Sequence, residues 1–442
     1  MVTYFPELAA RVLQQVEDLP EMYGDFDFSA TPERFTTDPN VKSALPSRRG
    51  DRQAYLDNPR LVELARTSLY LADVPADRIA ALSEKYSVTE LVGLIRRACK
   101  RGIESVPDAP TELADLLAVM ETKPDWIDYA LVEKGAARAR VSAGLIAPFV
   151  TRGAFIATFT NTYAALPMTI TGALSGPRAA HRVNETTAYF AVTTLPRALE
   201  RFGPGFEATA MVRVMHSMVR YNALKRSTDR NGRRRTWDAS IYGLPIPQLD
   251  QLPAGMIGPY LIALRALKNG RDFTEGERAM VEFYRYRCFL LGLPEELLPA
   301  NPEGIVNMFH IRGATLRDGF DDDCRKLVAS TMNAYLRPAD GLFDRIADSV
   351  EKSYSKVAFC AAFCDNNRKA ATDMGVDISL RDYARIAATG PFIAGRLIAV
   401  ALASRQPMLQ EVTNRYLTGQ VRHRLDVYGI PEYVTDRREY AH

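Results

Sequence analysis

His216 lies within an apolar stretch, RVMHSMVR (residues 213–220), that has an arginine at each end. In a helix, Arg213 lies three residues before the histidine and Arg220 four residues after it, so all three side chains point the same way. Two cations beside an imidazole lower its pKa by like-charge repulsion. Because a metal binds the neutral imidazole, the stretch predicts that His216 is a metal ligand.

A single histidine restricts the kind of metal centre. Zinc and non-haem iron need three or four protein ligands, whereas a porphyrin supplies four nitrogens to haem iron and one axial imidazole suffices. Haem b also carries two propionates, with which Arg213 and Arg220 could form ion pairs. The residues therefore favour haem b, with His216 on the iron. The structural alternative is a core histidine bonded to a carbonyl, with both arginines extended to solvent.

A second polar group precedes this stretch in the helix that begins RVNETTAYFAV. Arg182, Glu185 and Thr186 stand at positions i, i+3 and i+4, which places them on one helix face. In one interpretation this is an ordinary first turn, in which Glu185 favours the helix dipole and pairs with Arg182. In the other, the patch is catalytic: Glu185 accepts a proton and Thr186 supplies a hydrogen bond.

The composition limits the class of protein. The 442 residues are 47% hydrophobic and 25% charged, and the formal net charge is +3, which argues against a nucleic-acid partner. The cluster RNGRRR (230–235) is expected to be a solvated loop. The five cysteines are few, odd in number and scattered, which predicts a reducing compartment without a disulfide framework. Cys360 and Cys364 are expected to be small core residues.

The sequence has no stretch of 18 uninterrupted apolar residues. Residues 142–150 are cut off by Arg152, and residues 391–403 contain Arg396, so both are expected to be buried helices and not membrane spans. The N-terminus lacks the pattern of a secretory signal. We therefore expect a cytoplasmic protein without a transmembrane segment, and a homo-oligomer is left open.

Helical periodicity dominates the chain and strand-like alternation is nearly absent, which predicts an all-α fold. Residues 242–255 (YGLPIPQLDQLPAG) are expected to be a Pro-rich connection that is not helical throughout. Three regions are predicted: a helical N-terminal region (1–130), the cofactor-binding core (131–370), and C-terminal helices with a tail (371–442). The segments with the clearest helical spacing are 7–19, 60–72, 88–103, 111–121, 275–293, 322–336 and 379–390.

Three other histidines have plainer interpretations. His310, between Phe309 and Ile311, is expected to be a hydrogen-bonded core residue. His181 is expected to cap a helix or face solvent, and His423 to lie on the surface.

The pattern Arg182-x-x-x-Thr186, followed thirty residues later by His216 between Arg213 and Arg220, resembles the latex-clearing protein family. These are bacterial rubber oxygenases, with which a fungal oxygenase of mycophenolic acid biosynthesis (MpaB type) is grouped. Further similarity lies in Trp237-Asp238 and in the segment GLPIPQLD (243–250), and the likeness covers roughly residues 140–340.

The resemblance implies an all-α fold with a globin-like core, additional N- and C-terminal helices and bound haem b. It implies that His216 is the proximal iron ligand and that Arg182 and Thr186 lie near the distal side and the propionates. Arg213 and Arg220 match the arginines beside the ligand. The rubber enzymes activate O₂ and cleave carbon–carbon double bonds, so the expected activity is an oxygenase reaction.

Two departures from the family pattern alter this expectation. The rubber enzymes carry a lysine just before the threonine, where this chain has Glu185, and a further glutamate upstream, where residues 155–175 contain no acid. Because polymeric rubber cannot enter a cell and the protein is expected to be cytoplasmic, a small lipophilic substrate, isoprenoid or aromatic, is expected in place of polyisoprene. Its cavity is expected to be shaped by residues 144–170 and the 190s. The alternatives are a haem peroxidase or hydroxylase, and a haem-binding protein or cofactor-free scaffold without catalysis.

Overall fold

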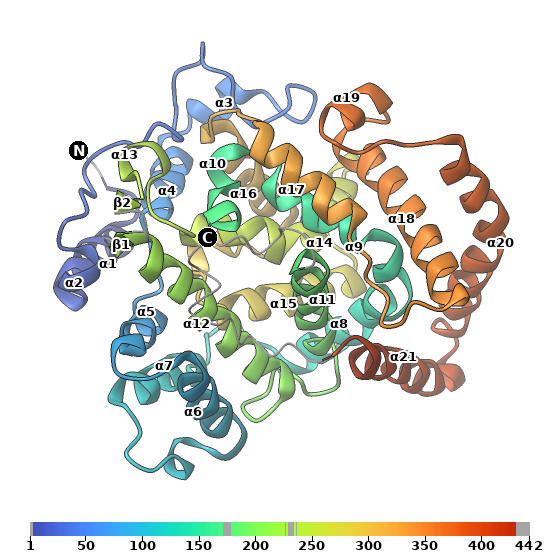
Figure 1. Cartoon of the computed structure of the whole chain (residues 1–442), viewed down its shortest axis with the longest axis horizontal. Coiled ribbons are helices and arrows are strands. Elements are labelled where there is room, and N and C mark those ends of the chain that lie inside the picture. Colours follow the sequence, from blue (N-terminus) through green and yellow to red (C-terminus); the bar gives the residue numbers. More distant parts are fainter. Residues whose placement is uncertain (1–2, 171–177, 226, 229–233, 236, 430–442) are drawn as a thin grey trace. The chain divides into compact units, whose positions relative to one another are not determined.

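The computed structural model describes residues 3–170, 178–225, 227–228, 234–235 and 237–429. These residues form an all-α protein, as the periodicity predicts (Figure 1). Within the described residues, the strands are the two-residue β1 (Ser227–Thr228) and β2 (Arg234–Arg235), which pair in antiparallel fashion. The predicted loop 230–235 lies mostly outside the described residues.

The chain divides into two compact units. Among the described residues, unit 1 comprises 3–135 and 199–319, and unit 2 comprises 136–198 and 320–429. This division differs from the three consecutive regions expected from the sequence, because the region 131–370 contributes to both units. Local patterns identify helices, but they carry no information on which distant segments pack together.

Unit 1 contains the helices that surround His216. The predicted N-terminal helices are confirmed; residues 111–121, for example, form a single helix with those bounds. Two helices of this unit begin with capping boxes, at Ser87 with Glu90 and at Thr274 with Glu277, in which side chains satisfy the first backbone N–H groups. The helices are α1 (Pro6–Asp18), α2 (Pro20–Tyr23), α3 (Arg52–Leu56), α4 (Pro59–Leu69), α5 (Val74–Ala81), η1 (Leu82–Glu84), α6 (Val88–Arg101), η2 (Ile103–Ser105), α7 (Thr111–Glu121), α12 (Pro204–Leu224), α13 (Ala239–Tyr242), α14 (Gln248–Lys268), α15 (Glu275–Leu290), η5 (Glu295–Leu297) and α16 (Pro302–Thr315). Helix α8 (Tyr129–Val141) ends beyond this unit's boundary at Gly135.

Helix α12 is the central element of unit 1 and packs against α5, α6 and α15 (Figure 1). It begins after the break at Gly203, with Pro204 in the first turn, where the missing N–H costs nothing. Nearly all of its residues from Gly205 to Tyr221 are buried. An all-round apolar sequence such as this one forms a helix enclosed by other helices.

Helix α14 begins earlier than the sequence indicates. The connection predicted over 242–255 spans only 243–247, because α14 starts at Gln248 and contains Pro253 and Pro259. A proline inside a helix leaves the carbonyl four residues earlier without its donor. For Pro259 that carbonyl is Gly255, and Arg287 Nη2 donates to it at 3.0 Å. A neighbouring helix thus replaces the hydrogen bond that proline removes.

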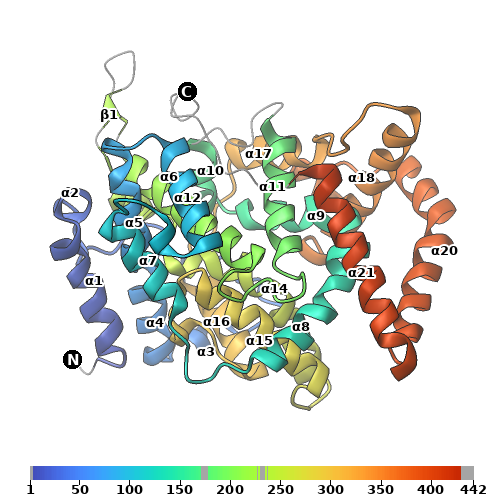
Figure 2. The same cartoon turned by 90° about the horizontal axis from the view of Figure 1, so that it is seen from below.

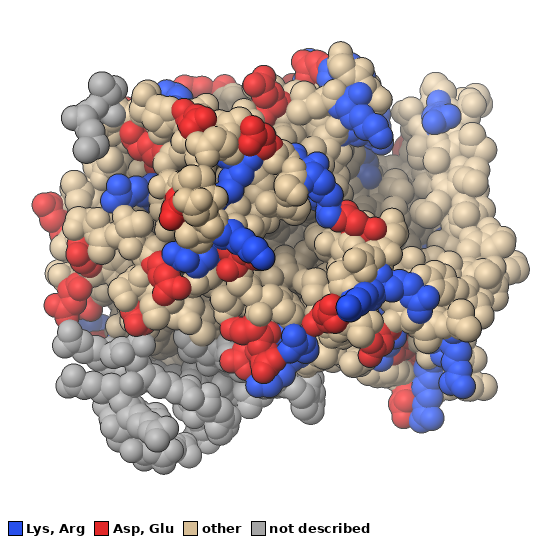
Figure 3. All heavy atoms as spheres, turned by 90° about the horizontal axis from the view of Figure 1, so that it is seen from above, with Lys and Arg blue, Asp and Glu red and all other residues tan. Residues whose placement is uncertain are grey.

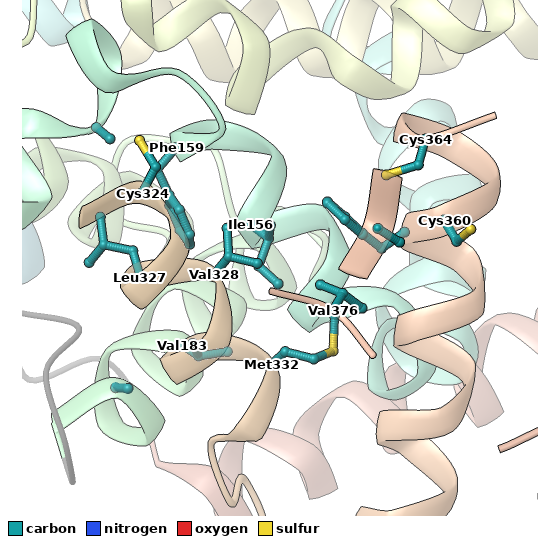
Figure 4. Close-up of a cluster of buried hydrophobic side chains, with 14 of the residues drawn as sticks. Ile156, Phe159, Val183, Cys324, Leu327, Val328, Met332, Cys360, Cys364 and Val376 are labelled. Carbon is teal, nitrogen blue, oxygen red and sulfur yellow. The ribbon is translucent and has the colours of Figure 1, made fainter. Parts of the chain in front are cut away.

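Unit 2 contains a second set of helices and its own core (Figure 4). Ile156 and Phe159 are fully buried in this core, where they pack against other side chains. The sequence had led us to expect residues 144–170 to shape a substrate cavity, and these two residues do not border one. Cys360 and Cys364 lie in the same core, as predicted, and the cysteines are free thiols. The elements are η3 (Ser142–Ile146, a π-helix), α9 (Ala147–Ile156), η4 (Ala157–Phe159), α10 (Thr162–Ile170), α11 (Arg178–Val192), α17 (Asp322–Asn333), α18 (Leu342–Phe363), α19 (Arg368–Asp373), α20 (Leu380–Ala403) and α21 (Pro407–Tyr428).

The burial expected for two apolar segments is wrong. The helical segments Tyr129–Phe159 and Leu380–Ala403 are long and apolar enough to cross a membrane, and only 22% and 6% of their most apolar windows are buried. The expectation of burial came from hydropathy alone, because exposing apolar surface to water is unfavourable. For α20 that prediction fails: most of its apolar residues are exposed to solvent.

Candidate functional site

His216 is the exception in its helix. Every residue from Ala208 to Tyr221 is buried apart from His216, which is partly exposed. Its Nδ1 lies 3.1 Å from Oε1 of Gln251 on α14, so the expected alternative of a fully buried histidine bonded to a carbonyl is not what the structure has. The imidazole is held at one nitrogen by a side-chain amide.

A chain of amides determines which nitrogen of His216 carries the proton. Gln251 Nε2 donates to Gln248 Oε1 at 2.8 Å, and Gln248 Nε2 donates to the carbonyl of Ala72 at 3.4 Å. A backbone carbonyl only accepts, so it orients both amides and turns the Gln251 oxygen toward His216. An oxygen acceptor there requires the proton on Nδ1. With the proton on Nδ1, a neutral imidazole carries its lone pair on Nε2.

Arg213 points into the interior of unit 1. Its Nε and Nη2 donate to both carboxylate oxygens of Asp73 at 2.8 and 2.6 Å, and its Nη1 donates to the carbonyl of Leu290 at 3.2 Å. Both side chains of this ion pair are almost fully buried. The bidentate pair joins α12 to the residue that precedes α5.

Arg220 makes a second buried ion pair about two turns further along α12. Its Nη1 contacts the carboxylate of Asp77, and both side chains are fully buried. Its Nε and Nη2 donate to the carbonyls of Pro245 and Ile246 at 3.0 and 2.7 Å. Tyr23 donates its hydroxyl to Asp77 at 2.7 Å. This network joins α12, α5 and the connection that leads into α14.

The placement of the two arginines argues against the propionate role expected for them. Each guanidinium of Arg213 and Arg220 already bonds a buried carboxylate and at least one backbone carbonyl. Taking either from its aspartate would leave an uncompensated buried charge, which is strongly destabilising. Arg213 and Arg220 therefore hold α12 in place, and the propionate role expected for them does not fit these contacts.

The connection before α14 is strained where it meets Arg220. Ile246 has a φ of +47°, a conformation that costs a β-branched residue on the order of 1–3 kcal/mol. The hydrogen bond from Arg220 to its carbonyl helps to hold it. Two residues later α14 begins with Gln248, so the strained residue sets the start of the helix that carries both amides.

Asp250 anchors the same end of α14. Its carboxylate accepts from Arg34 Nη2 at 2.7 and 2.9 Å and from Arg312 Nη2 at 2.8 Å. Burial by itself would raise the pKa of Asp250, but the adjacent Arg34 and Arg312 lower it below its usual value. Asp250 therefore stays ionised and holds Gln248 and Gln251 in register.

Replacing Asp250 by asparagine is expected to destabilise the protein by about 3 kcal/mol at neutral pH, because two arginines lose their buried counter-charge. The folded pKa is below the unfolded one, so this contribution is complete above about pH 4 and is lost as the pH falls through the folded value. Urea unfolding of both proteins at pH 7 and pH 3 measures the difference. A gap that is equally large at both pH values would contradict the ion-pair origin.

Helix α11 carries the second predicted group, and it belongs to unit 2, whereas His216 belongs to unit 1. Arg182 Nη1 donates to Glu185 Oε2 at 3.1 Å, and His181 Nε2 lies 3.4 Å from Glu185 Oε1. Glu185 is buried and Thr186 partly so. The structure pairs Arg182 with Glu185, as the first interpretation expects, but α11 begins at Arg178, so Glu185 does not lie in its first turn. Thr186 lies one residue further along the same helix.

The remaining histidines follow their predictions. His310 is buried between the hydroxyls of Tyr55 and Tyr260, at 2.8 Å from Nδ1 and 3.0 Å from Nε2. Burial, with a contribution from Arg49, lowers the pKa of His310. His181 is mostly exposed and His423 is exposed.

Sequence reasoning missed Asp73, Asp77 and Gln251. The acids stand at i and i+4 in the segment LADVPADRIAALS, where two carboxylates in an apolar run are an unusual feature. Gln251 lies one residue beyond the motif segment 243–250. The sequence therefore showed a glutamine next to the motif but did not show that it contacts His216.

The described residues contain no group of three or more histidine, cysteine, aspartate or glutamate side chains that could hold a bare metal ion. His216 is the histidine of this site, and an amide fixes its Nδ1. One axial ligand is the donor set that a metal already held by a macrocycle requires. The site therefore fits haem better than zinc or non-haem iron.

The chain is similar to known proteins in its sequence pattern and in its fold. Residues 144–430, more than half of the chain, match the family described as "ER-bound oxygenase mpaB/B'/Rubber oxygenase, catalytic domain". A solved structure entitled "Structure of Latex Clearing Protein LCP in the closed state" superimposes with a TM-score of 0.56 at 16% identity, covering 80% of this chain and 91% of that one. No curated protein matches. The matched region includes both α11 and α12, and the chain belongs to the mpaB/rubber oxygenase family.

Proposed function

We propose that this protein is a haem b-dependent oxygenase that oxidises a small lipophilic molecule with O₂. Membership of an oxygenase family indicates an oxidoreductase. The observation that carries the haem proposal is the amide chain Gln251–Gln248–Ala72, which puts the lone pair of His216 on Nε2. A lipophilic substrate is supported by the family's name, which includes a rubber oxygenase. The reaction, in our proposal, extends to oxidative cleavage of a carbon–carbon double bond.

His216 would hold the group through Nε2. When bound, haem b supplies the redox chemistry of iron with O₂, which no side chain of the chain provides. The residues around it supply position and charge. Gln251 accepts the Nδ1 proton and keeps the imidazole in one tautomer and one orientation, and Asp250 holds the helix on which Gln251 lies.

In this proposal, Glu185 moves a proton during the reaction and Thr186 provides a hydrogen bond beside it. Arg182 accompanies them: its Nη1 contacts Glu185 Oε2 and keeps that carboxylate oriented. The free cysteines of the described residues fit a reducing compartment, so we place the enzyme in the cytoplasm. Its partners are then O₂ and a small lipophilic substrate, without nucleic acid.

The experiment is an absorption spectrum of the purified chain, followed by O₂ uptake after reduction with and without short oligoisoprenoids or aromatic alkenes. The proposal expects a Soret band and substrate-dependent O₂ uptake. Turnover with peroxide but not with O₂ would make the protein a peroxidase. A band without turnover of either oxidant would make it a haem carrier or sensor. A colourless protein that takes up no added haem would overturn the proposal.

Replacing Gln251 by leucine is expected to weaken haem binding roughly 10- to 100-fold while leaving the protein folded, because the ligand loses the group that orients it. Haem titration followed at the Soret band measures the affinity. Gln14, an exposed glutamine on α1, provides the matched control in the variant Gln14→Leu. Equal haem affinity in both variants would show that Gln251 does not orient His216 for haem binding.

Replacing Glu185 by glutamine is expected to retain the Soret band and to lower turnover by about 100-fold, the effect typical of removing a group that transfers a proton. The glutamine still accepts the hydrogen bond from Arg182, so the structural role of the side chain survives. O₂ uptake under saturating substrate measures the loss. Turnover at the wild-type level would exclude Glu185 from proton transfer.

A further inference from the structure

Helices α20 and α21 of unit 2 form a hairpin joined at residues 404–406 (Figure 2). The most apolar window of α20 has a mean hydropathy of 1.7, and only 6% of it is buried. Phe392, Ile398 and Leu402 are 79%, 58% and 56% exposed. Large exposed apolar patches on a folded protein mark sites of interaction.

The exposed residues form a defined surface. Along α20, Ala388, Gly395, Ile398 and Leu402 recur at intervals of three, four and seven, which places them on one side of the helix. On α21, Met408 and Val412 lie two turns and one turn before Tyr416, which contacts α20 through Arg396. We call the exposed apolar residues of α20 and of the first two turns of α21 the hairpin face. Its large members include Phe392, Ile398, Leu402, Met408, Leu409 and Val412.

On α20 the charges are arranged around this face, whereas on α21 the exposed ion pair of Glu411 and Arg415 lies beside Val412. Between residues 386 and 403 the one charged side chain is Arg396, which points to α21, where its Nε and Nη2 donate to the Tyr416 hydroxyl and Nη2 donates to Gln420. Exposed Arg381 and Arg405 flank the apolar run at its two ends. They are separated by the length of α20, roughly 36 Å at 1.5 Å per residue.

Positive charge predominates over the whole hairpin. Residues 380–428 contain seven arginines and three carboxylates. The single carboxylate of α20, Asp382, is buried: it caps the helix through Ser379 and accepts from Ser353 of α18. In Figure 3, the right-hand margin, where Figure 1 shows α20, is largely uncharged with isolated basic groups. An apolar strip between cations is complementary to the interface of a membrane with anionic headgroups.

The polar groups of the hairpin also indicate how it would meet a membrane. The turn contains Ser404, Arg405 and Gln406, which would be costly to insert into hydrocarbon end-on. The opposite side of α20 is held to α18, where the Tyr354 hydroxyl lies 3.2 Å from Thr389 Oγ1. Because α18 holds one side of α20, the opposite apolar side is the one available to lie along a bilayer.

We propose that the hairpin face binds the surface of membranes that contain anionic lipids, with α20 lying in the plane of the interface. The residues of the hairpin face do not include those of the proposed haem site, so membrane binding can be tested separately from the proposed function. It would hold the protein at the membrane, where lipophilic molecules are concentrated.

The test is flotation of the purified full-length chain with vesicles of phosphatidylcholine, alone or with 30% phosphatidylglycerol. We expect binding that is stronger on the anionic vesicles and weaker at high salt. The variant Phe392→Ser/Ile398→Ser should bind at least tenfold more weakly. Phe202→Ser is the matched control, since Phe202 is a similarly exposed aromatic residue (63%) outside the hairpin, and its binding should equal that of the wild type.

Charge is tested separately with Arg381→Glu/Arg405→Glu, which should lose the preference for anionic vesicles. Sedimentation equilibrium of the wild type and of Phe392→Ser/Ile398→Ser tests whether a second copy of the chain covers the face instead. The wild type could be a dimer that does not bind vesicles, while Phe392→Ser/Ile398→Ser is a monomer. That result would make the face a contact between two copies and overturn the proposal. A monomer that binds neither vesicle would also overturn it, as would equal binding of both apolar variants.

Discussion

Replacing Asp77 by alanine is expected to destabilise the protein by about 3–5 kcal/mol, the cost of removing one partner of a fully buried ion pair. The guanidinium of Arg220 would keep its hydrogen bonds to Pro245 and Ile246 but lose its counter-charge. Tyr23 would lose the acceptor of its hydroxyl. Burial, with the neighbouring Asp77, raises the pKa of Tyr23, so that hydroxyl remains protonated and needs an acceptor. Urea unfolding at neutral pH measures the loss.

Two further variants separate the buried pair from the loss of a carboxylate in general. Asp340→Ala removes the acid of an exposed ion pair with Arg345 and should cost less than about 1 kcal/mol. Asp77→Leu/Arg220→Met removes both charges of the buried pair and should be more stable than Asp77→Ala. If Asp77→Ala and Asp340→Ala cost the same, the buried pair does not hold α12 on α5.

Replacing His216 by alanine is expected to abolish the Soret band or to reduce it to non-specific levels. The described residues offer no metal-binding cluster as a substitute. His310 is a poor replacement, because both of its ring nitrogens are bonded to tyrosine hydroxyls. Exposed His423 provides the matched control: His423→Ala should keep the full band. A wild-type band in His216→Ala would move the ligand elsewhere in the chain.

Local sequence patterns predicted the helices well, because amphipathic spacing and capping are properties of neighbouring residues. Residues 111–121 form a helix with the predicted bounds, and His310 is the bonded core residue expected from its apolar neighbours. The same patterns placed His216 on a helix. In the structure, all residues from 208 to 221 except His216 are buried.

What the sequence could not provide are the partners that come from far along the chain. Arg213 and Arg220 were assigned to propionates because Asp73 and Asp77 lie about 140 residues away. The start of α14 was misplaced because the prolines of 242–255 favour a connection, whereas the helix begins at Gln248 and contains Pro253. The exposure of α20 was missed because hydropathy alone does not distinguish a core helix from an apolar surface helix.

The central claim is that His216 binds haem iron through Nε2, in an orientation that Gln251 maintains. The most direct measurement is an imidazole titration of the haem-reconstituted variant His216→Gly, followed by absorption between about 380 and 600 nm, where haem absorbs. The account predicts that the variant alone lacks the wild-type spectrum and that imidazole restores it saturably. A variant whose spectrum already equals that of the wild type without imidazole, or that stays unchanged as imidazole is added, would contradict it.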